Sequence, residues 1–186
     1  MGELPKGMKV EMSDGPSLAY DLLYSMNHHD YPWDGPPVVV PFFDLDGSPH
    51  PLGAIPLIKA RYEEGGEVEL EPITIDELAE FLVSRDIERP PDPITAVAWV
   101  NELYIGSRDE ISDTIGDNPG DAEARCAMVR FVGGGVQAGL HIRGMEPAMW
   151  SSWEQSEAVP GQMTNREILD SLDLVLRALN TGTLDE

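Results

Sequence analysis

Cysteine is almost absent from this sequence, because Cys126 is the only one among 186 residues. A single cysteine cannot form a disulfide within the chain, and it cannot supply the paired thiols of a CxxC redox or zinc motif. The chain therefore has to fold through a hydrophobic core, and its length is sufficient for one domain with such a core. We expect Cys126 to be a packed thiol.

Basic residues are also scarce. The chain has 12 Lys and Arg against 34 Asp and Glu, which gives a formal net charge of -22. A surface of this sign repels phosphate backbones and anionic lipid headgroups. We therefore expect no nucleic-acid partner and no polybasic membrane role, and a basic protein is the partner that the charge favours. The alternative is that the acidity serves solubility alone.

Long hydrophobic runs are missing as well. No apolar stretch approaches the roughly 20 residues of a membrane-spanning helix. The segment Met1 to Glu11 lacks the apolar region of a signal peptide. We expect a protein that is not bound to a membrane and that resides in the cytoplasm.

Motifs of catalysis are the last absence. The sequence has no GxSxG nucleophile elbow, no HExxH zinc motif and no phosphate-binding loop with its lysine. Acid–base pairs could be drawn from 34 carboxylates, so the sequence alone selects none of them. The sequence predicts no catalytic residue and no cofactor, and it favours a protein that is not an enzyme.

Three segments have helical periodicity. The first follows Pro16 and ends near Asn27, and the second begins at the capping box Thr74 to Glu77. The third begins at the capping box Thr164 to Glu167 and ends near Asn180. Its apolar stripe predicts a buried face made of Ile168, Leu169, Leu172, Val175, Leu176 and Leu179.

Alternating apolar residues and turn signals predict the strands. Proline interrupts the segment Pro49 to Pro56, so no strand is expected there. The order of helices and strands predicts an α+β domain over residues 16–186, with an antiparallel sheet of about 4–6 strands and helices packed on one side. Residues 1–15 have no sustained period and are expected to be an irregular tail. The predicted strands are Val38–Phe43, Leu57–Tyr62, Val68–Ile73, Thr95–Ile105, Ala127–Phe131 and Val136–Ile142.

Part of this pattern resembles a known group of proteins. The strand Thr95–Ile105, the acidic connection after it and the hairpin Arg125 to Gly144, which ends in His141-Ile142-Arg143-Gly144, make up about a quarter of the chain. They resemble uncharacterised small acidic proteins of actinobacteria and their phages. The resemblance implies a provenance, and it implies no activity and no catalytic residue.

One local cluster has the chemistry of metal ligands. His28, His29 and Asp30 are adjacent, with Asp34 nearby. Neighbouring residues rarely chelate one ion together, so a site would need further ligands such as His50 or His141. A polar helix end explains the cluster more simply, and we predict no metal site.

An acidic row is the first candidate binding surface. Glu67, Glu69 and Glu71 alternate along a predicted strand, which places them on one face. Their spacing of about 6.6 to 6.8 Å is close to twice the ~3.4 Å rise per phosphate along one DNA strand. The row could imitate a phosphate row, or its like charges could simply prevent edge-to-edge aggregation.

Two tryptophans are the second candidate surface. Trp150 and Trp153 are three residues apart in a serine-containing stretch that leads to Pro160. Aromatic side chains concentrate at binding hot spots, although they fill protein cores more often. We predict that Trp150 and Trp153 are partly exposed.

These observations lead to three hypotheses of function. The first is a non-enzymatic acidic module of the inhibitor, immunity or DNA-mimic type that binds a basic face of a partner protein. The second is a metal-dependent hydrolase with scattered His and Asp ligands. The third is a structural or accessory component of a phage or host assembly. The sequence does not distinguish a monomer from an oligomer.

Overall fold

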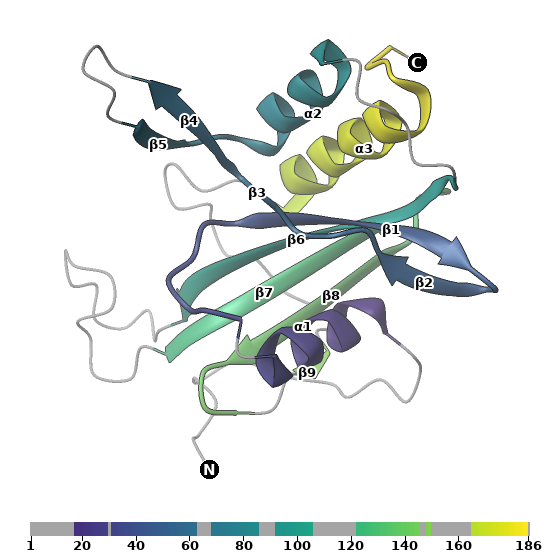
Figure 1. Ribbon diagram of the computed structural model, residues 1–186. Coiled ribbons are helices and arrows are strands. Elements are labelled where there is room, and N and C mark those ends of the chain that lie inside the picture. The colour runs from purple at the N-terminus through teal and green to yellow at the C-terminus, as the bar shows by residue number, and fades with distance from the viewer. Residues whose placement is uncertain are drawn as a thin grey trace. The chain divides into compact units, whose positions relative to one another are not determined.

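The structure is a computed structural model that describes residues 17–29, 31–62, 68–85, 92–105, 122–145, 148–149 and 165–185. Within these ranges the chain forms three helices and nine strands, most of which join an antiparallel sheet (Figure 1). The α+β class predicted from the sequence is therefore confirmed. The expected tail, residues 1–15, lies outside the described residues.

The elements occur close to where the sequence predicts them. The helices are α1 (Leu18–His28), α2 (Ile75–Ser84) and α3 (Asn165–Thr181). The strands are β1 (Val38–Leu45), β2 (Ser48–Pro51), β3 (Ile55–Pro56), β4 (Ile58–Tyr62), β5 (Val68–Pro72), β6 (Ile94–Ile105), β7 (Ala122–Phe131), β8 (Val136–Ile142) and β9 (Ala148–Met149). None of the three described helices is long and apolar enough to cross a membrane.

The described strands form two sheets. The larger has the order β2-β1-β6-β7-β8-β9, with β3 paired to β1 as well, and β4 and β5 make a two-stranded sheet of their own. The strands β2 and β3 correct the expectation that no strand forms from Pro49 to Pro56. Proline lacks a backbone N–H. It is tolerated in β2 because β2 is the outermost strand of its sheet, and the N–H groups on its free side would pair with no other strand.

The chain divides into two compact units. Unit 1 comprises Met1–Gly35, Val100–Val129 and Gln137–Gln155, and unit 2 comprises Pro36–Trp99, Arg130–Val136 and Ser156–Glu186. The boundaries fall inside β6, β7 and β8, so neither unit is a continuous stretch of sequence.

In unit 1, α1 packs closely on β8. The side-chain oxygen of Gln137 accepts the N–H of Leu18 at 2.8 Å, which satisfies one of the free donors at the helix start. Gly139 allows the close approach, because a Cβ atom there would lie 3.0 Å from Leu23 Cδ1 and 3.3 Å from the backbone of Ala19. Both Ala19 and Leu23 are fully buried.

In unit 2, α2 and α3 pack against each other, and polar contacts fix α3 to the neighbouring strands. The Asn180 side chain donates to the carbonyl of Ile94 at 2.9 Å and accepts the Ile94 N–H at 2.8 Å. Arg130 on β7 donates two bonds of 2.7 Å to the carboxylate of Asp173. Four residues of the predicted stripe on α3 are buried, namely Ile168, Leu172, Val175 and Leu176. The prediction was wrong for Leu169 and Leu179, which are half-buried, and Ser171 and Ala178 complete the buried face instead.

Candidate acidic site

Two of the three glutamates predicted as a binding row lie on β5. Glu69 and Glu71 are opposite Arg61 and Lys59 of β4 in the antiparallel register. Glu71 is paired, because its carboxylate lies 2.9 Å from Arg61 Nη1 and 3.7 Å from Lys59 Nζ. The hydrogen bond from Arg61 is the main cause that lowers the pKa of Glu71. Cations therefore accompany this row, whereas a phosphate row is uniformly negative.

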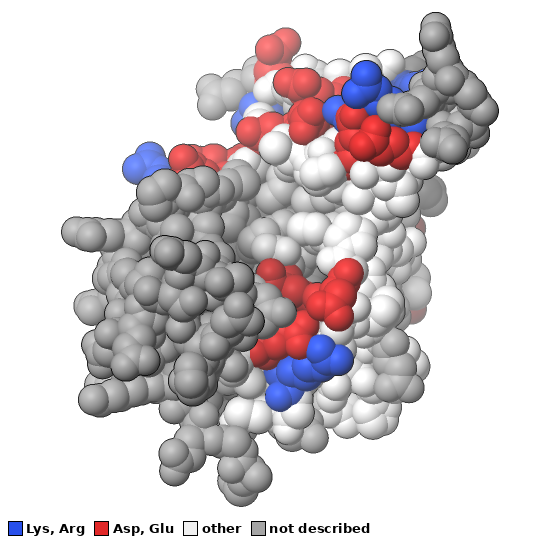
Figure 2. Space-filling view, turned by 90° about the vertical axis from the view of Figure 1, so that its left-hand side faces the viewer, with Lys and Arg blue, Asp and Glu red and all other residues white. Residues whose placement is uncertain are grey.

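The other predicted binding residues cannot be placed. Glu67, Trp150 and Trp153 lie outside the described residues. On the face shown in Figure 2, acidic atoms gather in groups that have Lys or Arg atoms beside them. Among the described residues of that face, the acidic groups are thus interspersed with basic ones.

A cluster of three carboxylates forms in unit 1. It joins Asp34 from the segment after α1, Glu102 from β6 and Glu123 from β7. One oxygen of each carboxylate lies within 4.8 Å of the other two. We call Asp34, Glu102 and Glu123 the acidic cluster. Among the described residues, no other group of three His, Cys, Asp or Glu side chains comes this close together.

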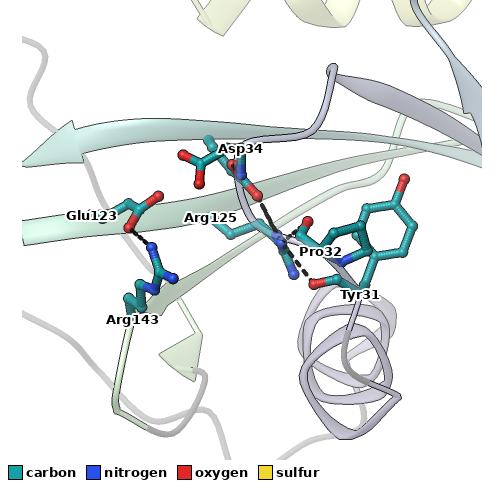
Figure 3. A network of polar contacts seen from close by, with 7 residues as sticks. Tyr31, Pro32, Asp34, Glu123, Arg125 and Arg143 are labelled. Carbon is teal, nitrogen blue, oxygen red and sulfur yellow. Dashed lines mark hydrogen bonds and ion pairs between the residues drawn. The ribbon is translucent and has the colours of Figure 1, made fainter.

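A buried arginine donates hydrogen bonds to the acidic cluster. Arg125 on β7 is only 1% exposed. Its Nε and Nη2 atoms donate to one oxygen of Glu102, at 3.2 and 2.7 Å. Nη2 also donates to the carbonyls of Pro32 at 2.9 Å and Tyr31 at 3.3 Å, as Figure 3 shows. Arg125 therefore fastens the segment after α1 to β6 and β7.

The aromatic rings of the same segment complete the setting of Arg125. Its guanidinium carbon lies 4.4 Å from the ring centre of Trp33 and 5.4 Å from that of Tyr31. Arg143 lies 5.3 Å from the Trp33 ring centre, and the ring of His141 is 5.4 Å away. Cations over aromatic rings are stabilised by the ring quadrupole, so Trp33 compensates part of the cost of burying Arg125.

Asp34 has an unusual backbone conformation. Its φ angle is 65°, in the left-handed region that Asp and Asn adopt more readily than other residues with a side chain. Its N–H donates to the second oxygen of Glu102 at 2.6 Å, which holds the turn in place. The residue is exposed, and no hydrogen bond or ion pair forms at its carboxylate in the described part of the chain. The cluster thus presents to solvent one carboxylate that has no direct ion pair among these residues.

The charges of the acidic cluster are not fully balanced. Arg143 forms an ion pair with Glu123, which raises the pKa of Arg143, mainly through the hydrogen bond and further through the charges of Glu123, Asp34 and Glu102. Arg125 is paired to Glu102, so within the described part of the chain three carboxylates and two guanidinium groups add up to a net charge of -1.

The histidines considered as metal ligands are not gathered into one site in the described residues. His28 and His29 are exposed at the end of α1, His141 is buried on β8, and His50 lies on β2, where its ring is 6.0 Å from that of Phe43. Asp30 lies outside the described residues. The carboxylates of the acidic cluster are the side chains there that resemble a metal-ligand set.

Sequence reasoning noted Asp34 but missed the other members of the acidic cluster. A signal was present for Arg125, since a charged residue inside an apolar strand, between Ala124 and Cys126, requires a buried partner. Glu102 gave a similar signal, because it interrupts the apolar run of its strand. The pairing of the two could be found only from the strand register.

No protein-family model, no curated protein and no solved structure matches this chain. The resemblance to small acidic proteins of actinobacteria and their phages therefore stays an expectation.

Proposed function

We propose that this protein is a non-enzymatic acidic interaction protein that binds a basic face of a partner protein. The observation that carries the proposal is the acidic cluster, in which three carboxylates lie within 4.8 Å of one another and two guanidinium groups of the described residues form ion pairs with them. A Lys or Arg of a partner would balance the remaining charge by an ion pair with the exposed Asp34 carboxylate.

Preorganisation supports this function. The carboxylate of Glu102 is fixed by Arg125, and the backbone of Asp34 is fixed by Glu102, so within the acidic cluster the entropy lost on binding falls mainly on the Asp34 side chain. The overall charge of -22 would attract a basic partner from a distance and increase the rate of encounter. The same proposal includes a cytoplasmic location and a role of the inhibitor, immunity or DNA-mimic type.

The test compares two variants that remove one negative charge each. Asp34→Asn removes the charge, and asparagine adopts the left-handed backbone conformation as readily as aspartate does. Glu80→Gln removes a charge from the exposed side of α2, away from any ion pair in the described residues. Both proteins and the parent are used to capture partners from lysate of the source organism at low and at high salt, with identification by mass spectrometry.

We expect a basic protein that the parent and Glu80→Gln retain at low salt, that Asp34→Asn retains at least about tenfold less, and that high salt releases. Equal retention by all three proteins would mean that net charge, and not the acidic cluster, is responsible. Retention of no basic protein by the parent at either salt would overturn the proposal.

A metal-dependent hydrolase is the alternative proposal. Hard divalent cations prefer oxygen ligands, and the acidic cluster provides three carboxylates. The interaction protein fits better, because Glu102 and Glu123 already accept hydrogen bonds from Arg125 and Arg143. Calorimetric titration with Mn²⁺ decides between them. Binding of one ion that Asp34→Asn abolishes and Glu80→Gln preserves would favour the metal.

The third proposal is an accessory component of a phage or host assembly. It predicts a stable homo-oligomer whose size does not change with salt. Sedimentation velocity at low and high salt measures this directly, and a monomer under both conditions would contradict it.

A further inference from the structure

The hairpin of β4 and β5 has one charged and one apolar face. Lys59, Arg61, Glu69 and Glu71 alternate with apolar residues in the register of the two strands. On the apolar face of β5, Val68 is 51% exposed and Leu70 is 62% exposed. These two side chains are among the most exposed large apolar residues of the described chain, and they are adjacent on one face.

The backbone of β5 is open on one side. The strand pairs with β4, and within the described residues its backbone forms no hydrogen bond to any other element. An unpaired strand edge is a template for another strand. The edge strand β2 differs, since Pro49 and Pro51 remove two of its four backbone donors. In β5, Pro72 removes one of five backbone donors, and Val68 to Glu71 keep theirs.

The charge of the hairpin indicates which kind of strand could pair with the open edge of β5. Glu69 lies on β5 without an ion pair in the described part of the chain, and the sequence joining the two strands adds Glu63, Glu64 and Glu67. A second copy of β5, paired antiparallel to the first, would bring the glutamates of the two copies together, which is unfavourable. A strand with Lys or Arg at alternate positions would instead place its cations opposite Glu69.

We infer that the outer edge of β5 is a docking site for an extended basic segment of a partner protein, which adds to β4 and β5 as a third strand. Backbone hydrogen bonds would supply affinity, apolar residues of the segment would cover Val68 and Leu70, and its Lys or Arg residues would face Glu69. The edge of β4 is less suitable, because Lys59 and Arg61 would repel such a segment. The inference rests on the proposed function in that the partner is basic.

The experiment uses the full chain and three synthetic peptides. The probe is a capped seven-residue peptide of alternating Lys and Val. The second peptide has the same sequence with every central backbone nitrogen methylated, which keeps the charge but removes the donors, and the third has Glu in place of Lys. Binding is measured by calorimetry, and amide NMR shifts report which strand responds.

We expect the Lys peptide to shift the amides of β5, and we expect the methylated and the Glu peptides to bind at least about tenfold more weakly. Glu69→Lys and Leu70→Ser should each reduce the affinity, whereas the matched changes Glu80→Lys and Val132→Ser should not. Val132 is a suitable control because it is 60% exposed. Circular dichroism of each variant verifies that it is folded.

Three results would overturn the inference. Equal binding of the methylated peptide would show recognition of charge without strand addition, and the proposed function would stand. Binding of none of the peptides, together with capture of a basic protein that depends on Asp34, would also refute the docking site alone. A dimer of the full chain that Leu70→Ser dissociates would assign the edge to a second copy.

Discussion

Arg125 is the residue whose removal should cost the most. It is buried, it donates to Glu102 and to the carbonyls of Tyr31 and Pro32, and Trp33 covers its guanidinium. Changing it to Met keeps much of the volume but leaves the Glu102 carboxylate and two carbonyls without their donor. Removing one partner of a buried ion pair costs about 3 to 5 kcal/mol.

We therefore expect Arg125→Met to lower the free energy of unfolding by that amount, as measured by urea denaturation. The matched control is Arg143→Met, since Arg143 is 53% exposed and its ion pair with Glu123 should contribute less than about 1 kcal/mol. Equal losses for the two variants would show that Arg125 is not the anchor of the acidic cluster.

The reactivity of the Cys126 thiol reports whether this side chain is buried. Desolvation raises the pKa of its thiol from 9.0 to about 12. The folded protein should therefore not react with a disulfide reagent at pH 8, while the urea-unfolded protein should react fully. Between pH 9.0 and about 12 the unfolded thiol loses its proton and the folded one keeps it, so stability should fall as the pH rises. Rapid labelling of the folded chain would contradict this burial.

At the scale of the element, the start of α2 has a measurable pH dependence. The Glu77 carboxylate accepts the backbone N–H of Thr74 at 2.8 Å, and this bond is the main cause that lowers the pKa of Glu77 below 4.5. A lowered carboxyl pKa stabilises the folded state above the unfolded pKa, and this contribution is lost as the pH falls through the folded pKa.

Glu77→Gln should thus be less stable than the parent at pH 7, and the difference should shrink as the pH falls below 4.5. Thermal unfolding monitored by circular dichroism across this pH range provides the measurement. A difference for Glu77→Gln that is constant with pH would mean that the carboxylate charge does not stabilise the helix start.

The last helix tests packing. Leu172 is fully buried on α3, so Leu172→Ala should lower the free energy of unfolding by about 2 to 5 kcal/mol through lost transfer energy and the cavity left behind. Leu169 is half-buried on the same helix, and Leu169→Ala should cost less. Urea denaturation of both variants makes the comparison. A loss well under about 1 kcal/mol for Leu172→Ala would refute the assignment of the buried face.

Local sequence could predict the helices and most of the strands, because capping residues, apolar periodicity and turn residues act over a few residues. Thr74 with Glu77 and the stripe through Leu172 are examples. The prolines of β2 led to the wrong prediction that no strand forms there, because proline lacks a backbone N–H donor. The pairing of β2 with β1 is nevertheless possible because β2 lies at the edge of the sheet, and a local sequence does not reveal that position. The acidic cluster could not be predicted, because Asp34 and Glu102 are 68 residues apart and meet only through the folded sheet.

At the scale of the whole molecule, three strands are divided between the two compact units. Because β6, β7 and β8 each contribute residues to both units, unfolding one unit would disrupt strands of the other. We expect a single cooperative transition in calorimetry, with equal calorimetric and van't Hoff enthalpies. Two separate transitions would contradict this, and they would also contradict the prediction that residues 16–186 form one domain.

The glycine at position 139 has a consequence for how this sequence can diverge. Gly133 and Gly134 adopt positive φ angles, so their requirement is conformational, and Asn or Asp could replace them in part. Gly139 is instead limited by space, since a Cβ atom there would lie only 3.0 Å from the Leu23 side chain and 3.3 Å from the backbone of Ala19. A larger residue at 139 therefore requires a smaller residue at position 23, a shift of α1 that moves the backbone of Ala19 away, or both. In related sequences, these two positions should therefore covary, whereas the turn glycines should vary independently of the helix.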